Sequence, residues 1–402
     1  GGMGIPTGKL SLYTAAAGIQ PSWALPVSLD VGTDNSELIA DPNYLGRRTP
    51  RLRGAEYDAF VESFVRGVQA AFPGCVIQWE DFKQQNAIRI LERYRNTVPS
   101  FNDDIQGTGA VALAGIFAAI AAGGGTGSGR LEGQRALFYG AGAATLGIAR
   151  LLRHALAAAG VEGLALDTAI VALDSKGIVH DGRGELGDGK AELALGADAV
   201  RALGVETLLD APLADVIAQV KPSILIGTSG QAGAFAESTI RAMAASAAAP
   251  LIWPLSNPTS CAEATPSDIL AWSEGRAIVA TGSPFDPVVV DGAPRTISQA
   301  NNVYIFPGVG LAAIAGRLKS IPDEAFAVAA KRLAALTAES APAGGALYPP
   351  LADLRAISRA IAIAVIEAGA VSGWAAPADG ARAEELVDGA MWSPSYRAYV
   401  PA

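Results

Sequence analysis

A predicted strand, a glycine turn and a predicted helix follow one another after residue 134, and this order constrains the fold most. Arg135-Ala-Leu-Phe-Tyr139 favours a strand, and Gly140-Ala-Gly142-Ala-Ala-Thr-Leu-Gly147 opens a helix that continues to about Ala159. Glycines at such a turn let the backbone approach a pyrophosphate at the helix N-terminus. We therefore expect a Rossmann-like dinucleotide domain, with cofactor contacts from Gly140, Gly142, Ala143 and Thr145. Thr145 replaces the Gly or Ala of the strict pattern, while Gly147 still permits close helix packing.

The next predicted strand indicates how the cofactor would be held. It covers residues 168–173 and ends at Asp174, where an acid would face the adenosine ribose. Asp174 alone suggests NAD, but Ser175 and Lys176 follow it directly and supply a hydroxyl and an ammonium for the extra phosphate of NADP. We favour NADP on this basis, although a solvated turn without a ligand would account for the three residues equally well.

Three further predicted strands each end in small polar residues. They cover residues 223–227, 250–255 and 277–281. Ligands of a parallel sheet bind beyond the carboxyl ends of its strands, and Asn257, which follows the second of these strands, is the most interesting of the polar residues there. The fold class we predict is α/β, with a doubly wound parallel-sheet dinucleotide domain beside a second α/β domain. Residues 25–31 are also expected to form a buried strand.

Two adjacent pairs of acids, Glu80-Asp81 and Asp103-Asp104, lie beside apolar sequence. Adjacent carboxylates repel, and their burial is costly unless a cation or hydrogen bonds compensate. Helix capping accounts for one acid of the second pair but for neither acid of the first. Oxygen ligands suit Mg²⁺ or Mn²⁺. A zinc site is improbable, because the chain has only two histidines and Cys75 is the only cysteine near the acids.

Composition narrows the classes of partner. The net charge is −9 and no cluster of Lys and Arg stands out, so we expect neither nucleic acid nor a membrane as a partner. Two cysteines in 402 residues argue against a disulfide framework and fit a reducing compartment, the cytoplasm. The small-apolar run at residues 109–122 predicts a buried helix that is too short to span a bilayer.

Several motifs, in order along nearly the whole chain, jointly resemble the malic enzymes. They are Gly2-Met-Gly-Ile-Pro-Thr-Gly-Lys9-Leu, Leu29-Asp-Val-Gly-Thr-Asp-Asn35, Glu80-Asp-Phe, Phe101-Asn-Asp-Asp-Ile-Gln-Gly-Thr108, Ser256-Asn-Pro-Thr and Asn301-Asn-Val-Tyr-Ile-Phe-Pro-Gly308. The resemblance implies oxidative decarboxylation of L-malate to pyruvate and CO₂, with a divalent metal and reduction of NADP or NAD. A homo-oligomer, dimer or tetramer, is expected.

The resemblance also implies a role for each matching residue. Glu80, Asp81 and Asp104 would bind the metal, and Asp103 would support proton transfer. Lys9 would be the general base and contact malate, while Asn257 and Asn302 would hold malate and the nicotinamide end. A lysine must be neutral to act as a base, so we expect nearby cationic charge and desolvation to lower the pKa of Lys9.

One departure from the family pattern concerns proton donation. The tyrosine general acid and the malate-binding arginine of the family lie upstream of the motif that begins here at Gly1, and neither has a counterpart in this chain. We expect this chain alone to have little or no malate-decarboxylating activity, and to be a portion of a longer enzyme or to rely on separately supplied N-terminal residues. The alternatives are a malolactic enzyme, and a nucleotide-binding or assembly fragment without activity.

The expected domains follow from the same resemblance. A first part of the substrate and metal domain covers residues 1–103, the dinucleotide domain 104–301, a second part of the substrate and metal domain 302–373, and a C-terminal tail 374–402.

Overall fold

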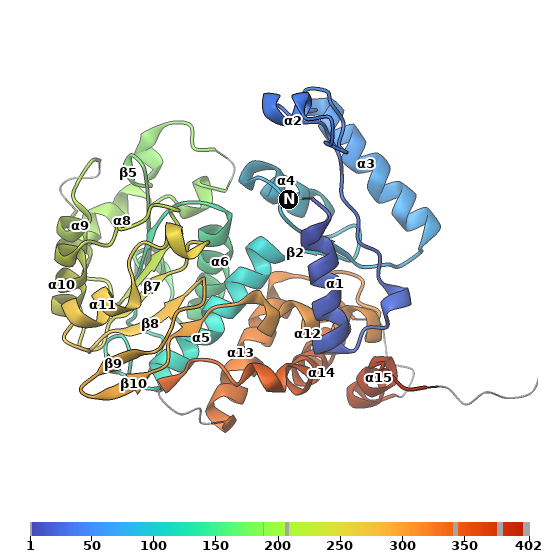
Figure 1. Cartoon of the computed structure of the whole chain (residues 1–402). Helices are drawn as coiled ribbons and strands as arrows, with labels where there is room; N and C mark the ends of the chain where they lie inside the picture. The colour runs from blue at the N-terminus through green and yellow to red at the C-terminus, as the bar shows by residue number, and fades with distance from the viewer. Residues whose placement is uncertain (1, 188, 206–208, 341–344, 376–380, 397–402) are drawn as a thin grey trace, which may run out of the picture.

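A seven-stranded sheet forms one half of the molecule in the computed structural model (Figure 1). The structure describes residues 2–187, 189–205, 209–340, 345–375 and 381–396. The strand order is β11-β8-β7-β6-β3-β4-β5, and every neighbouring pair is parallel except β4 with β5. The strands are β3 (Ala136–Tyr139), β4 (Ile170–Asp174), β5 (Gly177–Ile178), β6 (Ile224–Gly227), β7 (Leu251–Pro254), β8 (Ile278–Thr281) and β11 (Ser298–Gln299). The order reverses between β3 and β6, where a doubly wound sheet binds its ligand.

Helices cover both faces of this sheet. On β3, Phe138 belongs to the large core that contains α5 and α6, whereas Leu137 belongs to the core formed with the helices of the other face. Neighbouring residues of β3 contact opposite faces of the sheet because successive side chains of a strand point in opposite directions. One face carries α5 (Thr108–Ala121) and α6 (Ala143–Ala158), and the other carries α8 (Ala197–Leu203), α9 (Leu213–Val220), α10 (Glu237–Ser246) and α11 (Pro266–Trp272).

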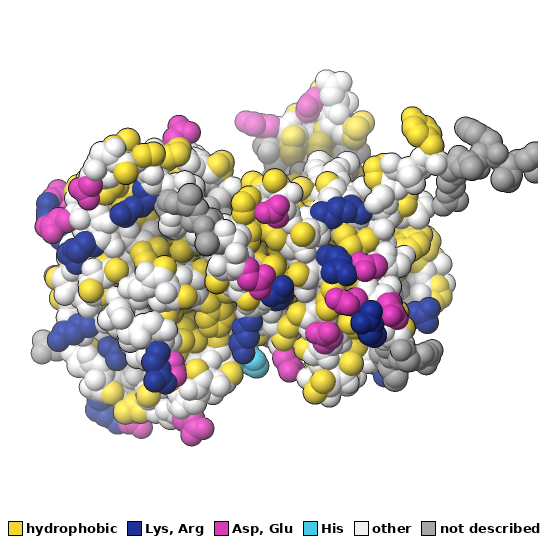
Figure 2. All heavy atoms as spheres, turned by 90° about the horizontal axis from the view of Figure 1, so that it is seen from below, with side chains coloured by type: hydrophobic (Ala, Val, Ile, Leu, Met, Phe, Trp, Pro, Cys, Tyr) yellow, Lys and Arg dark blue, Asp and Glu magenta, His cyan; other side chains and the backbone are white. Residues whose placement is uncertain are grey.

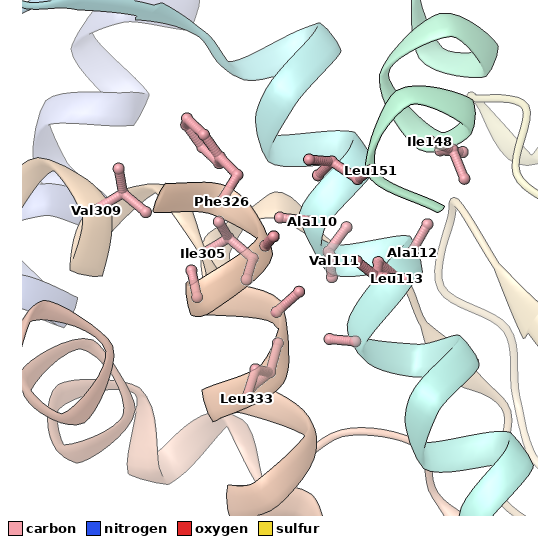
Figure 3. Packing of buried hydrophobic residues seen from close by; sticks show 14 of the residues in the cluster. Ala110, Val111, Ala112, Leu113, Ile148, Leu151, Ile305, Val309, Phe326 and Leu333 are labelled. Atoms are coloured by element: carbon pink, nitrogen blue, oxygen red, sulfur yellow. The ribbon is translucent and has the colours of Figure 1, made fainter. Parts of the chain in front are cut away.

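The helix α5 is the centre of the larger core. Apolar side chains of α5 pack with α6, α12 (Phe306–Ala315) and α13 (Asp323–Ser340), as Figure 3 shows. The segment Asp103–Ala121 has the length and hydropathy of a membrane span, but 72% of its apolar stretch is buried inside the protein. Such burial is that of a core helix, as the sequence predicted.

The N-terminal residues form a separate lobe beside the sheet (Figure 1). Its long helices bury aromatic residues against a short strand, with Trp79 at the centre of a small core. The elements are α1 (Gly4–Ala17), α2 (Ser36–Ala40), α3 (Gly54–Ala71), β1 (Ile77–Trp79), α4 (Gln84–Tyr94) and β2 (Ser100–Asn102). The helix α1 packs on α12 and on α14 (Leu354–Ser372), and α15 (Ala383–Ala390) packs on α12 and α14 as well.

One expected strand, at residues 25–31, is not a strand in the structure. Residues 24–35 form an irregular segment in which Leu25 is 65% exposed, so its apolar residues do not define a buried strand. The apolar residues after Asn301 form a 3-10 turn, η6 (Asn302–Tyr304), followed by α12. Pro307 fits the first turn of α12, where no backbone N–H is needed. A β9–β10 hairpin (Val288–Val290 and Ala293–Arg295) had not been expected.

Charged groups of both signs are interspersed over the face seen from below (Figure 2). No single-sign field of the kind that attracts a polyanion covers this face.

Candidate active site

Parallel pairing of two short strands brings the two acid pairs together. Trp79 of β1 lies opposite Asn102 of β2, so Glu80 and Asp81 leave the sheet at the same edge as Asp103 and Asp104. The second pair opens a π-helical turn, η2 (Asp103–Gly107), that leads into α5. Single π-turns inside helices are frequent at functional sites. The convergence of the acids thus follows from strand register.

Lys9 reaches this edge from α1. Its Nζ lies 2.5 Å from Asp103 Oδ2 and 3.1 Å from Glu80 Oε1, and 4.5 Å from the ring centroid of Phe306. The ammonium therefore has an anion on two sides and an aromatic face on a third. Such contacts hold a long side chain in one place and favour its charged form.

The pKa of Lys9 differs from the sequence prediction. Burial lowers the pKa of the ammonium, but the charges and hydrogen bonds of Asp103 and Glu80 outweigh burial, and the pKa is raised. The desolvation was anticipated correctly, whereas the neighbouring charges are anionic and not cationic. The neighbouring carboxylates therefore favour the protonated form of Lys9.

Asp103 is completely buried and is held by Asn302. The Nδ2 of Asn302 donates to Asp103 Oδ2 at 3.2 Å and to the backbone oxygen of Asp103 at 3.1 Å. Burial raises the pKa of Asp103 although Lys9 and Asn302 oppose the shift. Asp103 Oδ1 has no hydrogen-bond partner among the described residues, and a side chain at Gly107 would place Cβ 1.8 Å from it. The free oxygen can accept a proton or a hydrogen bond from a further group.

Glu80, Asp81 and Asp104 supply hard oxygen donors at the same edge. The backbone N–H of Asp81 donates to Asp104 Oδ2 at 2.9 Å, and Asp81 has a positive φ of 58°. Burial and the nearby Asp103 raise the pKa of Glu80 to about 7, and burial raises the pKa of Asp104. A divalent cation bound between these carboxylates would offset the energetic cost of burying their negative charges. Within the described residues, however, no group of three or more His, Cys, Asp or Glu side chains is close enough to hold a metal ion.

Tyr13 and Gln78 belong to the site but were missed in the sequence. The Tyr13 hydroxyl donates to Gln78 Oε1 at 2.5 Å, and Gln78 Nε2 donates to Glu80 Oε2 at 3.0 Å. Tyr13 lies one helical turn after Lys9, and Gln78 lies two residues before Glu80 on the same side of its strand. Residues at i+4 on a helix and at i+2 along a strand lie on the same side. This spacing from Lys9 and from Glu80 is the sequence signal that could have identified Tyr13 and Gln78.

The glycine turn packs closely against the residue that follows β6, Thr228. Gly140 has a φ of 119°, and a Cβ there would lie 2.7 Å from Thr228 Oγ1. Thr145 bridges the turn to the neighbouring strand: its hydroxyl donates to Gly140 O at 2.8 Å and lies 2.6 Å from Thr228 Oγ1. Gly142 precedes Ala143, the first residue of α6. The threonine is therefore a structural part of the turn.

Asp174 ends β4 and is paired with two cations that the sequence did not indicate. Lys190 Nζ lies 2.8 Å from Asp174 Oδ2, and Arg183 Nη2 lies 2.9 Å from Oδ1. Burial raises the pKa of Asp174, but these cations and the Lys176 N–H outweigh burial and lower it. Ser175 and Lys176 are exposed beside it. Arg183 and Lys190 lie too far along the chain for a local motif to have linked them to Asp174.

The two candidate asparagines lie in different contacts. Asn257 follows β7, and its Oδ1 accepts a hydrogen bond from Ser283 at 2.5 Å. Asn302 is bound to Asp103 and Thr108. Asn302 thus joins the Lys9 cluster, and Asn257 lies at the end of the central sheet.

A doubly wound sheet with a glycine turn at its switch point is the arrangement of the dinucleotide-binding class of proteins, and here the lysine–carboxylate cluster accompanies it. Two family models match the chain: malic enzyme, N-terminal domain, over residues 1–95, and malic enzyme, NAD binding domain, over residues 105–370. The chain belongs to the malic enzyme family.

Individual relatives agree with this assignment. The NAD-dependent malic enzymes of Shewanella baltica and Vibrio campbellii are each 43% identical over 399 residues, which are 99% of this chain and 70% of the relative. The malic enzyme structure from Entamoeba histolytica has a TM-score of 0.74 at 24% identity, covering 97% of this chain and 69% of that one. The structure from Pyrococcus horikoshii has a TM-score of 0.70 at 22% identity, covering 97% and 76%. The two structures support the fold.

Proposed function

We propose that this chain carries the metal, base and cofactor sites for oxidative decarboxylation of L-malate to pyruvate and CO₂. The observation that supports the proposal best is the contact of Lys9 with both Asp103 and Glu80, at the edge where Asp81 and Asp104 also converge. As described, Glu80, Asp81 and Asp104 are not close enough to hold a metal ion together. The proposal therefore requires that their side chains draw together around Mg²⁺ or Mn²⁺, which would polarise the substrate hydroxyl and the ketone formed from it.

Lys9 and Asp103 would move the hydroxyl proton. A charged Lys9 cannot accept a proton, so the base must first lose one, and Asp103 lies 2.5 Å away to receive it. The raised pKa of the buried Asp103 makes that carboxylate a better proton acceptor than an exposed Asp. Asn302 would keep Asp103 Oδ2 oriented towards Lys9.

We propose NAD as the preferred cofactor and keep NADP as the alternative that the sequence favoured. Asp174 can accept hydrogen bonds from ribose hydroxyls, and the relatives at 43% identity are named NAD-dependent. Arg183 and Lys190 neutralise Asp174, and the same two cations could hold a phosphate, which supports NADP. Parallel titrations with NADH and NADPH decide between them.

The proposed domain division keeps the expected boundaries of 1–103, 104–301, 302–373 and 374–402. Packing of α1 on α12 and α14 supports the grouping of the first and third segments. We also propose a homo-oligomer, and a cytoplasmic location that agrees with the free Cys75 and Cys261.

The function is tested by product analysis with malate, Mn²⁺ and either cofactor. Pyruvate and reduced cofactor formed in equal amounts would support the proposal, whereas lactate without net cofactor reduction would indicate a malolactic enzyme. We predict slow turnover of malate by this chain alone. A rate on the order of 10 per second or more would contradict the prediction of low activity. Cofactor binding without any malate-dependent turnover would support the fragment alternative.

A further inference from the structure

A completely buried acid lies between two strand ends and has no part in the proposed chemistry. Glu263 has no exposed surface and follows the 3-10 turn η5 (Thr259–Cys261). No Lys or Arg forms an ion pair with it in the part of the chain that the structure describes. Because a buried carboxylate without a cation is costly, its hydrogen bonds must compensate.

The compensating donors come from two neighbouring strands. Glu263 Oε1 accepts hydrogen bonds from the backbone N–H of Ser229 at 2.8 Å, the Ser229 hydroxyl at 2.8 Å and the Ser256 hydroxyl at 2.5 Å. Glu263 Oε2 faces the backbone N–H of Ser256 at 3.4 Å. Ser229 follows β6 and Ser256 follows β7, so one carboxylate joins both loops.

Close packing fixes the carboxylate further. A Cβ at Gly227 would lie 2.5 Å from Glu263 Cδ, so the backbone at the end of β6 lies directly against the acid. The Ser256 hydroxyl also accepts from the Gly230 N–H at 2.8 Å, and the backbone oxygen of Glu263 accepts from the Phe235 N–H at 2.9 Å. The acid is therefore held from its side chain and from its main chain.

The loops that Glu263 joins form a wall of the glycine turn. Thr228 N donates to Tyr139 O at 2.9 Å, and its hydroxyl contacts Thr145 at 2.6 Å. Asn257, the candidate cofactor contact, directly follows Ser256. A shift of either loop would therefore move groups at the switch point, where the cofactor binds.

We propose that Glu263 is a positioning residue for the dinucleotide site: its carboxylate fixes the loops 227–230 and 255–257 at the separation that the nicotinamide cofactor requires. The inference rests on the proposed cofactor site. Glu263 itself touches neither cofactor nor substrate and acts through Ser229, Ser256 and their neighbours.

Titration of the full chain with NADH, followed by cofactor fluorescence, tests the proposal. Glu263→Gln preserves the shape but replaces one acceptor oxygen by a donor, so at least one of the inward-facing N–H or O–H groups loses its partner. We expect the Kd for NADH to rise about tenfold while the protein remains folded. Glu274→Gln, at an exposed turn, is the matched control and should leave the Kd unchanged.

A double-variant cycle separates positioning from a general effect on stability. If Glu263 acts through Ser256, adding Ser256→Ala to Glu263→Gln should weaken NADH binding less than Ser256→Ala does in the wild-type chain. Should Glu263→Gln fail to fold, Ser256→Ala alone must still raise the Kd. An unchanged NADH Kd in folded Glu263→Gln, or independent effects of the two changes, would overturn the role of Glu263. A wild-type chain that binds no NADH would instead overturn the proposed cofactor site.

Discussion

Asp103 and Asp104 are neighbours in the chain but have different partners. Asp103 is bound to Lys9 and Asn302, whereas Asp104 accepts from the Asp81 N–H. The sequence and its resemblance could point to all four acids and to Lys9. They could not predict the direction of the Lys9 pKa shift, because the charges that face Lys9 come from Glu80, directly after β1, and from Asp103 in η2, both far along the chain.

At the same scale, Asp174→Asn tests the cofactor assignment. Removal of the carboxylate charge should weaken NADH binding by about tenfold, because ribose hydroxyls lose a charged acceptor. NADPH binding should be unchanged or stronger, since repulsion of the extra phosphate disappears while Arg183 and Lys190 remain. Calorimetric titration of both cofactors measures the two effects, with exposed Asp215→Asn as the control. Equal weakening of both cofactors would count against a ribose contact.

Asp174 also predicts a pH dependence of stability. Its folded pKa is lowered, so its ion pairs contribute stability above the pKa of the unfolded chain, about 3.9. That contribution should be lost as the pH falls through the lower, folded pKa. Urea unfolding at pH 7 and at successively lower pH should therefore show a difference between wild type and Asp174→Asn that shrinks with acidification. A difference that grows instead would refute the assignment.

At the scale of elements, the contact of η2 with α6 links the acids to the cofactor helix. A Cβ at Gly147 would lie 1.8 Å from the backbone oxygen of Ile105, and a Cβ at Gly109 would lie 2.6 Å from the oxygen of Gly147. The sequence predicted that Gly147 permits close packing. It did not predict that the packing partner is the turn that carries Asp103 and Asp104.

Gly147→Ala should therefore destabilise the protein by roughly 2–3 kcal/mol, because a backbone must move to admit the methyl group. Gly67→Ala is the matched control: Gly67 is an exposed glycine of α3 with nothing within 4 Å of its added Cβ. That change should stabilise the protein by about 0.5–1 kcal/mol. Chemical unfolding measures both. Equal effects of the two substitutions would show that the close contact does not matter.

Elements with strong local patterns were predicted well, and those set by distant contacts were not. The parallel strands β3, β4, β6, β7 and β8 and the helices α5 and α6 lie close to their expected positions. The apolar residues at 25–31 resemble a strand, yet no strand pairs with them in the described structure. The helix α12, for which we derived no expectation from the sequence, packs against α1 and α14.

At the scale of the whole molecule, the candidate site lies where the N-terminal lobe meets the sheet-containing half. Lys9, Glu80 and Asp103 come from α1, the end of β1 and η2, and Asn302 approaches from η6. Ion pairs also cross this boundary: Arg150 of α6 contacts Glu92 of α4 at 2.8 Å, and Arg95 contacts Asp323 at 2.7 Å. The order of predicted strands and helices along the sequence was enough to predict the fold class. The distances between the site residues and the ion pairs across the boundary could be obtained only from the folded structure.

The most direct test of the proposed division of the acids is calorimetric titration of Mn²⁺ into the wild-type chain, Asp104→Ala and Asp103→Asn. We predict one Mn²⁺ site in the wild type, no detectable site in Asp104→Ala, and a retained site in Asp103→Asn, because Asp103 serves Lys9 and not the metal. An unchanged Mn²⁺ affinity in Asp104→Ala, or loss of the site in Asp103→Asn alone, would contradict the account.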